Sequence, residues 1–112
     1  MTRYLISFDD GWMDFLEEDL DDVSKASHAV VDAAKSAGVW IFGAGLHSQR
    51  ATIIAPDGTT TEGAYPETKA VLGGFCIIEV ATRDEAISWG KKVAASCRCT
   101  QEVRELMFDP ES

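Results

Sequence analysis

The sequence predicts an α+β domain in which two helices pack against one β-sheet. Two segments with helical spacing of apolar residues alternate with shorter segments that have the alternating or continuous apolar character of strands. Turn and capping signals fall between these segments. With 112 residues, 46% of them hydrophobic, the chain is long enough to build a core, and we expect a single domain spanning residues 1–112.

The first half of the chain begins with a predicted strand over residues 2–8, which places Tyr4, Ile6 and Phe8 on one face. A helix is predicted over residues 20–37, and Gly38 is a suitable terminator. Its apolar residues recur every three or four positions and predict one buried stripe: Val23, Ala26, Val30, Ala33 and Ala37. The opposite face, with Asp21, Lys25, His28, Asp32 and Lys35, is predicted to face solvent.

The second half begins with predicted strands over residues 39–46, 51–55 and 59–62, the last two joined by the turn signal Pro56-Asp57-Gly58. A continuous apolar run over residues 75–80 predicts a strand inside the sheet. Thr82 and Glu85 form a capping box that opens a helix to about Ser96. Its predicted inner stripe is Ala86, Gly90, Val93 and Cys97, and a last strand is predicted over residues 101–108.

This order of elements predicts a ferredoxin-like fold, βαββαβ with an extra β-hairpin. Its two helices would pack on one face of the sheet. The strands are apolar on both sides, so the other face needs a cover as well. Self-association of two sheets is the simplest cover, and we therefore expect a homodimer.

The composition argues against several classes of partner. The formal net charge is −9, from 19 acidic and 10 basic residues, so the surface repels nucleic acid and anionic membranes. No apolar run approaches the length of a bilayer span, and the first residues do not resemble a signal peptide. Three cysteines without a targeting segment indicate reduced thiols, and we expect a cytoplasmic protein.

The most informative segment is the polar, glycine-punctuated loop that precedes the strand at Phe75. It carries Tyr65, Glu67 and Lys69, which supply a hydroxyl, a base and an anion anchor, respectively, for a small-molecule pocket. Loops on a rigid scaffold are where such chemistry concentrates. The alternative is structural: Glu67 and Lys69 would then pair, or bond the backbone, to fix the start of the strand.

The same segment, Glu62-Gly-Ala-Tyr-Pro-Glu-Thr-Lys-Ala-Val-Leu-Gly-Gly-Phe75, resembles the YCII-related superfamily, in particular its branch named for a DGPF motif. Asp57-Gly58, Asp84-Glu-Ala-Ile87 and Val103-Arg104 extend the resemblance over nearly the whole chain. The motif is degraded: Glu62, Ala64 and Tyr65 replace Asp, Pro and Phe. The resemblance implies a ferredoxin-like fold and a dimeric α/β barrel. Some relatives in the wider superfamily act on aromatic or lactone-like molecules, with a His–Asp pair proposed as their active site.

Two histidines are further candidates. His47 follows the strand that ends at Gly43-Ala44-Gly45, which would place it at a pocket rim; an ordinary loop residue is the alternative. His28 lies about one position out of register with the first-helix histidine of some relatives. Asp32, four residues on, could orient it as a general base, whereas its place on the solvated stripe favours a surface histidine.

No metal or cofactor site is predicted. The segment from Asp9 to Asp22 contains eight acidic residues and no basic one, but it lacks EF-hand spacing, so a solvated, helix-capping role is favoured over a cation site. Cys97 and Cys99 are separated by one residue, unlike the spacing of a redox turn or a zinc knuckle. Cys76, in a central strand, is expected to be buried and inert.

These observations predict a small cytoplasmic YCII-like homodimer. One hypothesis is a cofactor-independent enzyme that performs acid–base chemistry on a small polar or aromatic organic molecule in a dimer cleft. Its candidate catalytic residues are Tyr65, Glu67, Lys69 and His47. The alternative is a non-catalytic regulatory dimer that binds a metabolite or another protein, and a structural role in a larger assembly is a third possibility.

Overall fold

The computed structural model describes residues 1–47, 51–63 and 72–112. Its elements follow one another in the predicted order: β1 (Thr2–Asp9), a single 3-10 turn η1 (Glu17–Asp19), α1 (Leu20–Ser36), β2 (Trp40–Gly45), β3 (Thr52–Ile54), β4 (Thr60–Glu62), β5 (Leu72–Val80), α2 (Arg83–Cys97) and β6 (Glu102–Glu105).

The main sheet has four strands in the order β2-β5-β1-β6, and all neighbouring strands are antiparallel. Helix α1 connects β1 to β2, and α2 connects β5 to β6. Without the β3–β4 hairpin this is a β-α-β-β-α-β arrangement, so the structure is an α+β fold compatible with the predicted ferredoxin-like plan. The sheet of the single chain is open and does not close into a barrel.

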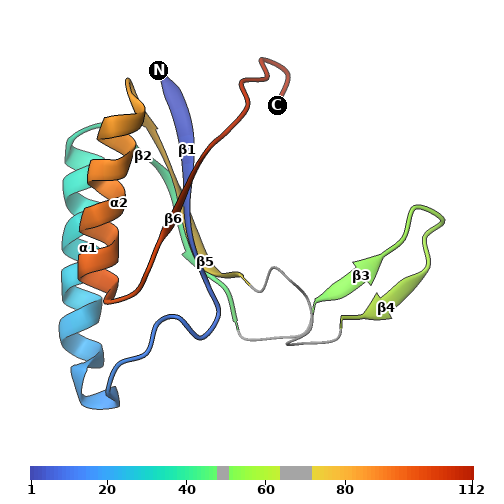
Figure 1. Ribbon diagram of the computed structural model, residues 1–112, viewed down its shortest axis with the longest axis horizontal. Coiled ribbons are helices and arrows are strands. Elements are labelled where there is room, and N and C mark those ends of the chain that lie inside the picture. Colours follow the sequence, from blue (N-terminus) through green and yellow to red (C-terminus); the bar gives the residue numbers. More distant parts are fainter. Residues whose placement is uncertain (48–50, 64–71) are drawn as a thin grey trace.

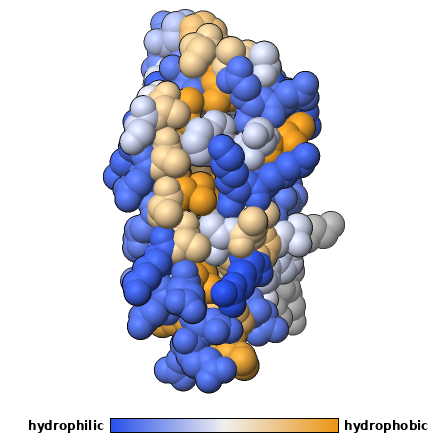
Figure 2. All heavy atoms as spheres, turned by 90° about the vertical axis from the view of Figure 1, so that its left-hand side faces the viewer, coloured by the Kyte–Doolittle hydropathy of each residue, from blue (hydrophilic) through white to orange (hydrophobic). Residues whose placement is uncertain are grey.

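Both helices lie on the same side of the four-stranded sheet, and the β3–β4 hairpin extends away from it (Figure 1). The helices contact each other along their length, and α2 also contacts β5 and β6. Seen from the helix side, the surface is mainly hydrophilic (Figure 2). The helices therefore shield one face of the sheet from solvent, as predicted.

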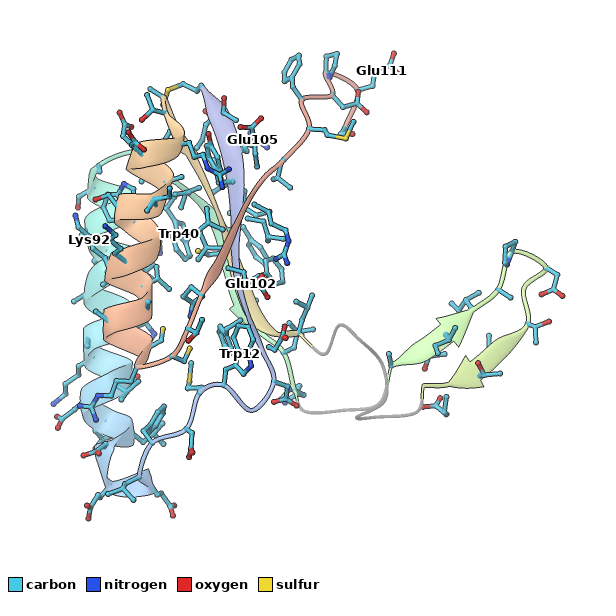
Figure 3. All side chains as sticks on the ribbon, in the orientation of Figure 1. Trp12, Trp40, Lys92, Glu102, Glu105 and Glu111 are labelled. Carbon is cyan, nitrogen blue, oxygen red and sulfur yellow. The ribbon has the colours of Figure 1, made fainter. Side chains whose placement is uncertain are left out.

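The core lies in the layer between this face and the helices. Alternation along β5 points Cys76, Ile78 and Val80 into the layer, where each is buried. Tyr4 and Ile6 of β1 lie beside them and are buried as well. The ring of Trp40 points from β2 into the same layer (Figure 3).

Local signals in the sequence explain where the helices begin and end. The Thr82 hydroxyl accepts a hydrogen bond from the backbone N–H of Glu85 at 3.2 Å, and the Glu85 carboxylate accepts one from the N–H of Ala81 at 3.4 Å. The predicted capping box is thus confirmed. Gly38 follows α1 with φ of +75°, and Arg98 follows α2 with φ of +54°.

The predicted stripe of α1 is wrong in part. Val23 is buried and Val30 half-buried, but Ala26, Ala33 and Ala37 are exposed. The inward row is instead Val23, Ser27, Val31 and Ala34. This row buries the larger side chain of Val31 in place of the methyl group of Ala33, and the gain in apolar area explains the rotation of the helix.

The last predicted strand is also shorter than expected. Residues 101–108 were predicted to be extended, whereas β6 spans only Glu102–Glu105, the length over which it pairs with β1. Met107 and Phe108 lie beyond the pairing and are almost fully exposed. In the described parts of the chain, neither helix is long and apolar enough to cross a membrane.

Candidate functional site

Three of the four candidate catalytic residues, Tyr65, Glu67 and Lys69, lie outside the described residues. The fourth, His47, is exposed and follows β2 by two residues. The backbone N–H of Leu46 donates to the carbonyl oxygen of Gly73 at 2.9 Å. His47 therefore lies at the end of the sheet where residues 64–71 join β5.

A groove of about 320 Å³ opens at the same end of the sheet. It lies between the sheet, α1 and α2. Its described lining comes from three strands, both helices and the segments that follow β1 and α2: Ile6, Phe8, Met13, Ser27, His28, Val31, Ala44, Gly45, Phe75, Cys76, Val93, Cys97 and Gln101. Because Gly45 lies two residues before His47 and Phe8 packs against Gly73 and Gly74, the groove adjoins both the candidate histidine and the start of β5.

The groove is hollow where the neighbouring part of the layer is filled. A Cβ at Gly43 would lie 2.6 Å from the Trp40 ring and 3.0 Å from the Cβ of Cys76. A Cβ at Gly45, two residues along the same face of β2, would meet no heavy atom within 4 Å. The sheet is thus packed against the helices at Gly43 and open to the groove at Gly45.

Polar groups are few and come mainly from α1 and the segment after α2. The Ser27 hydroxyl lies 3.4 Å from the sulfur of Cys97, and the Ser24 hydroxyl lies 3.4 Å from Nδ1 of His28. The Gln101 amide donates to the sulfur of Cys99 at 3.1 Å. His28 is exposed, as the solvated stripe predicted, but it also lines the groove, and its side-chain contact is with Ser24 rather than Asp32.

Burial makes the thiols of Cys76 and Cys99 less acidic. Burial raises the pKa of Cys76 to about 11, with a smaller contribution from the neighbouring Cys97. Burial also raises the pKa of Cys99, although the hydrogen bond from Gln101 opposes this shift. A raised pKa keeps a thiol protonated near neutral pH, and a protonated thiol is a poor nucleophile. Cys76 is therefore a packing residue, as expected.

The acidic segment contributes to the groove through an apolar residue. Between β1 and η1 the chain turns at Gly11, where the N–H of Trp12 donates to the carbonyl of Asp9 at 3.1 Å, and Met13 then reaches the groove. Trp12 lies near this end of the sheet (Figure 3). Among residues 1–47, 51–63 and 72–112, no three His, Cys, Asp or Glu side chains are grouped so that they could hold a metal ion.

Sequence reasoning missed the groove and six of its lining residues in particular: Met13, Ser27, Val31, Ala44, Gly45 and Gln101. Ser27 carried a usable signal, because a small polar residue in the inward row Val23, Ser27, Val31 and Ala34 marks a place where the helix does not need a large side chain. Ser27 was not recognised because the predicted buried stripe of α1 did not include it.

A comparison with protein-family models matches residues 4–107 to the YCII-related domain. The match covers almost the whole chain, so the protein belongs to the YCII-related domain family. A comparison with curated proteins found no significant match.

Proposed function

We propose that this protein is a cytoplasmic homodimer of the DGPF branch of its family. In this proposal it is an enzyme that performs cofactor-independent acid–base chemistry on a small polar or aromatic organic molecule. One observation supports the proposal: the groove, His47 and the start of β5, which directly follows the residues Tyr65, Glu67 and Lys69 in the chain, share one end of the sheet. Concave, mainly apolar pockets with a few polar groups are the usual form of small-molecule sites.

The proposed roles follow from the chemistry of each side chain. Tyr65 acts as an acid or hydrogen-bond donor, Glu67 as the base, Lys69 as an anion anchor and His47 as a proton shuttle. Cysteine is given no role, because the raised pKa of Cys76 and Cys99 argues against a thiolate nucleophile. Three free cysteines in the chain support a reducing, cytoplasmic location.

A ligand screen followed by a turnover assay tests this function. Thermal shifts would be measured against neutral, anionic and cationic organic molecules, and a ligand at 100 times its dissociation constant should stabilise the protein by about 2.7 kcal/mol. Hits would then be followed by NMR for chemical conversion. Glu67→Gln and Tyr65→Phe should abolish conversion. Glu62→Gln is the matched control, because Glu62 is exposed and bonds Thr52 within the hairpin.

The dimer is proposed to form through the sheet face that the helices leave uncovered. Register and alternation place Leu5, Phe42, Phe75 and Ile77 on this face, and the rings of Phe42 and Phe75 lie 6.0 Å apart. Phe42 is 55% exposed in the single chain. A contiguous exposed apolar surface of this kind is typical of an interaction site.

The charges on this face support a second copy as the occupant. Arg3 pairs with Glu79 at 2.9 Å, and Arg104 pairs with Glu102 at 2.5 Å. These four groups sum to zero in a chain of net charge −9, so two copies can approach each other here with little repulsion. Analytical ultracentrifugation should show a dimer that Phe42→Asp dissociates and Phe108→Asp, the matched change in the exposed tail, does not. A monomeric parent protein would sink the proposal.

The second candidate is a non-catalytic dimer that binds a metabolite or a protein. The described lining of the groove favours it in one respect: apart from His28 and the thiols, it contains no titratable side chain. Binding without conversion, unchanged by Glu67→Gln, would select this candidate over the enzyme.

A further inference from the structure

The ligand class follows from the charges around the groove. None of its described lining residues is Lys, Arg, Asp or Glu. A carboxylate or phosphate placed there would lose its hydration without gaining a cationic partner from these residues, and an ammonium group would lose its hydration without gaining a carboxylate from them. The described lining therefore disfavours either charge inside the groove.

The approach to the groove disfavours anions further. The segment from Asp9 to Asp22, which supplies Met13 to the lining, contains eight acidic residues and no basic one. Such a segment produces a negative potential at the groove mouth, and this potential lowers the local concentration of anions.

The polar side chains of the lining can still orient a ligand. Nδ1 of His28 faces the Ser24 hydroxyl, so Nε2 is the nitrogen that remains for a ligand. The Gln101 amide nitrogen is engaged with Cys99, so its oxygen remains as an acceptor. Both groups belong to the lining, and together they suit a polar ligand group that can donate and accept.

We infer that the groove binds an uncharged, mainly apolar small molecule with one hydrogen-bonding polar group, such as a primary amide. The inference rests on the proposed function and narrows its substrate class. An uncharged ligand fits the roles proposed for Tyr65, Glu67 and His47. The anion anchor proposed at Lys69 would then serve the anion that forms when Glu67 removes a proton from the ligand.

Three probes of the same shape test the inference. 2-Naphthamide, 2-naphthoate and 2-naphthylmethylamine share a ring system and differ mainly in the charge of the polar group. Their dissociation constants would be measured by ligand-observed NMR at pH 7.5 on the full chain. We expect the amide to bind at least about ten-fold more tightly than either charged probe, because a charge in the groove is desolvated and unpaired.

Variants locate the binding within the groove. Gly45→Leu should abolish amide binding, since its side chain enters space that holds no heavy atom within 4 Å of a Cβ at this position. Met13→Lys should raise the affinity for 2-naphthoate by placing a cation in the lining. Leu16→Lys adds the same charge at an exposed position of the same segment outside the groove, and it should leave the preference for the amide unchanged.

Two results would overturn the inference in distinguishable ways. If 2-naphthoate binds as tightly as the amide and Gly45→Leu abolishes the binding of both probes, the groove is a ligand site but the inferred ligand class is wrong. If no probe binds the folded protein, or if Gly45→Leu leaves binding intact, the groove is not the ligand site. The proposed function then also loses its support, because it depends on this groove.

Discussion

The two ends of the layer between the helices and the sheet are built differently from the same strands. At one end, Ile78 and Val80 are almost fully buried, and the Trp40 ring fills the space over Gly43. At the other end, Phe8 and Val31 remain half-buried, and the space over Gly45 forms the groove. The difference indicates that more apolar side chain is buried at the first end, whereas the second end keeps the open space in which we propose that a ligand binds.

The first prediction compares one side chain from each end. Ile78→Ala should lower the free energy of unfolding by about 3 kcal/mol, because Ile78 is 1% exposed and its loss leaves a cavity. Val31→Ala should cost about 1 kcal/mol, since the groove beside Val31 already holds solvent-accessible space. Urea denaturation measures both values. Equal costs would mean that the two ends are packed alike.

The second prediction concerns thiols that border the two ends. Burial raises the pKa of Cys76 from 9.0 to about 11, so at pH 8 its thiolate fraction falls by about 100-fold. Burial also raises the pKa of Cys99, whereas Cys97 is half-buried beside the groove. Ellman's reagent should therefore modify one thiol of the native protein rapidly and all three in urea. Cys97→Ser should remove the fast phase; its persistence would contradict the assignment.

The third prediction compares the two glycines of β2. Gly43→Ala should destabilise the protein by about 1–3 kcal/mol, because its Cβ would lie 2.6 Å from the Trp40 ring and force a shift in packed atoms. Gly45→Ala should be neutral or stabilising by about 0.5 kcal/mol, since its Cβ meets open space and alanine restricts the unfolded chain. Thermal unfolding separates the two outcomes. A costly Gly45→Ala would show that the groove is closed in solution.

The elements of the fold could be predicted because their signals are local. Thr82 and Glu85 mark the start of α2, Gly38 marks the end of α1, and Pro56-Asp57-Gly58 marks the hairpin turn, where Gly58 has φ of +89°. Each of these depends on residues close together in the chain. Their agreement with the structure reflects backbone preferences that tertiary contacts did not override.

The groove could not be predicted because it depends on which face of α1 meets the sheet. Val23 belongs to both the predicted row and the observed one. Which row faces the sheet is decided by whether Val31 or Ala33 packs inward. That competition involves long-range packing that no local spacing reveals. The loop with Tyr65, Glu67 and Lys69 lies outside the described residues, so its proposed roles stay predictions, whereas His47 lies at the sheet end where we expected a pocket rim.

The smallest expected effect concerns Tyr4, at the packed end. Burial raises its pKa above 10.0; the negative charge of Glu105 and the 3.4 Å hydrogen bond that Tyr4 donates to it act in the same direction. Because the folded state holds the proton more tightly than the unfolded state, this contribution to stability is complete below pH 10 and is lost as the pH rises through the raised pKa.

Tyrosinate absorbance gives a direct measurement of this shift. The chain has two tyrosines, so Tyr65→Phe leaves Tyr4 as the one that titrates. The midpoint of the Tyr4 titration should lie above that of the same variant in urea, and Glu105→Gln should lower it by removing the nearby charge.

The raised pKa values of Cys76 and Cys99 also contribute to the stability of the folded protein, and this contribution is lost in the same alkaline range. Tyr4→Phe should therefore reduce the alkaline loss of stability without abolishing it. A Tyr4 midpoint equal to that in urea would show that the packed end admits water to the phenol, and the contrast between the two ends would then be weaker than the burial of Tyr4 indicates.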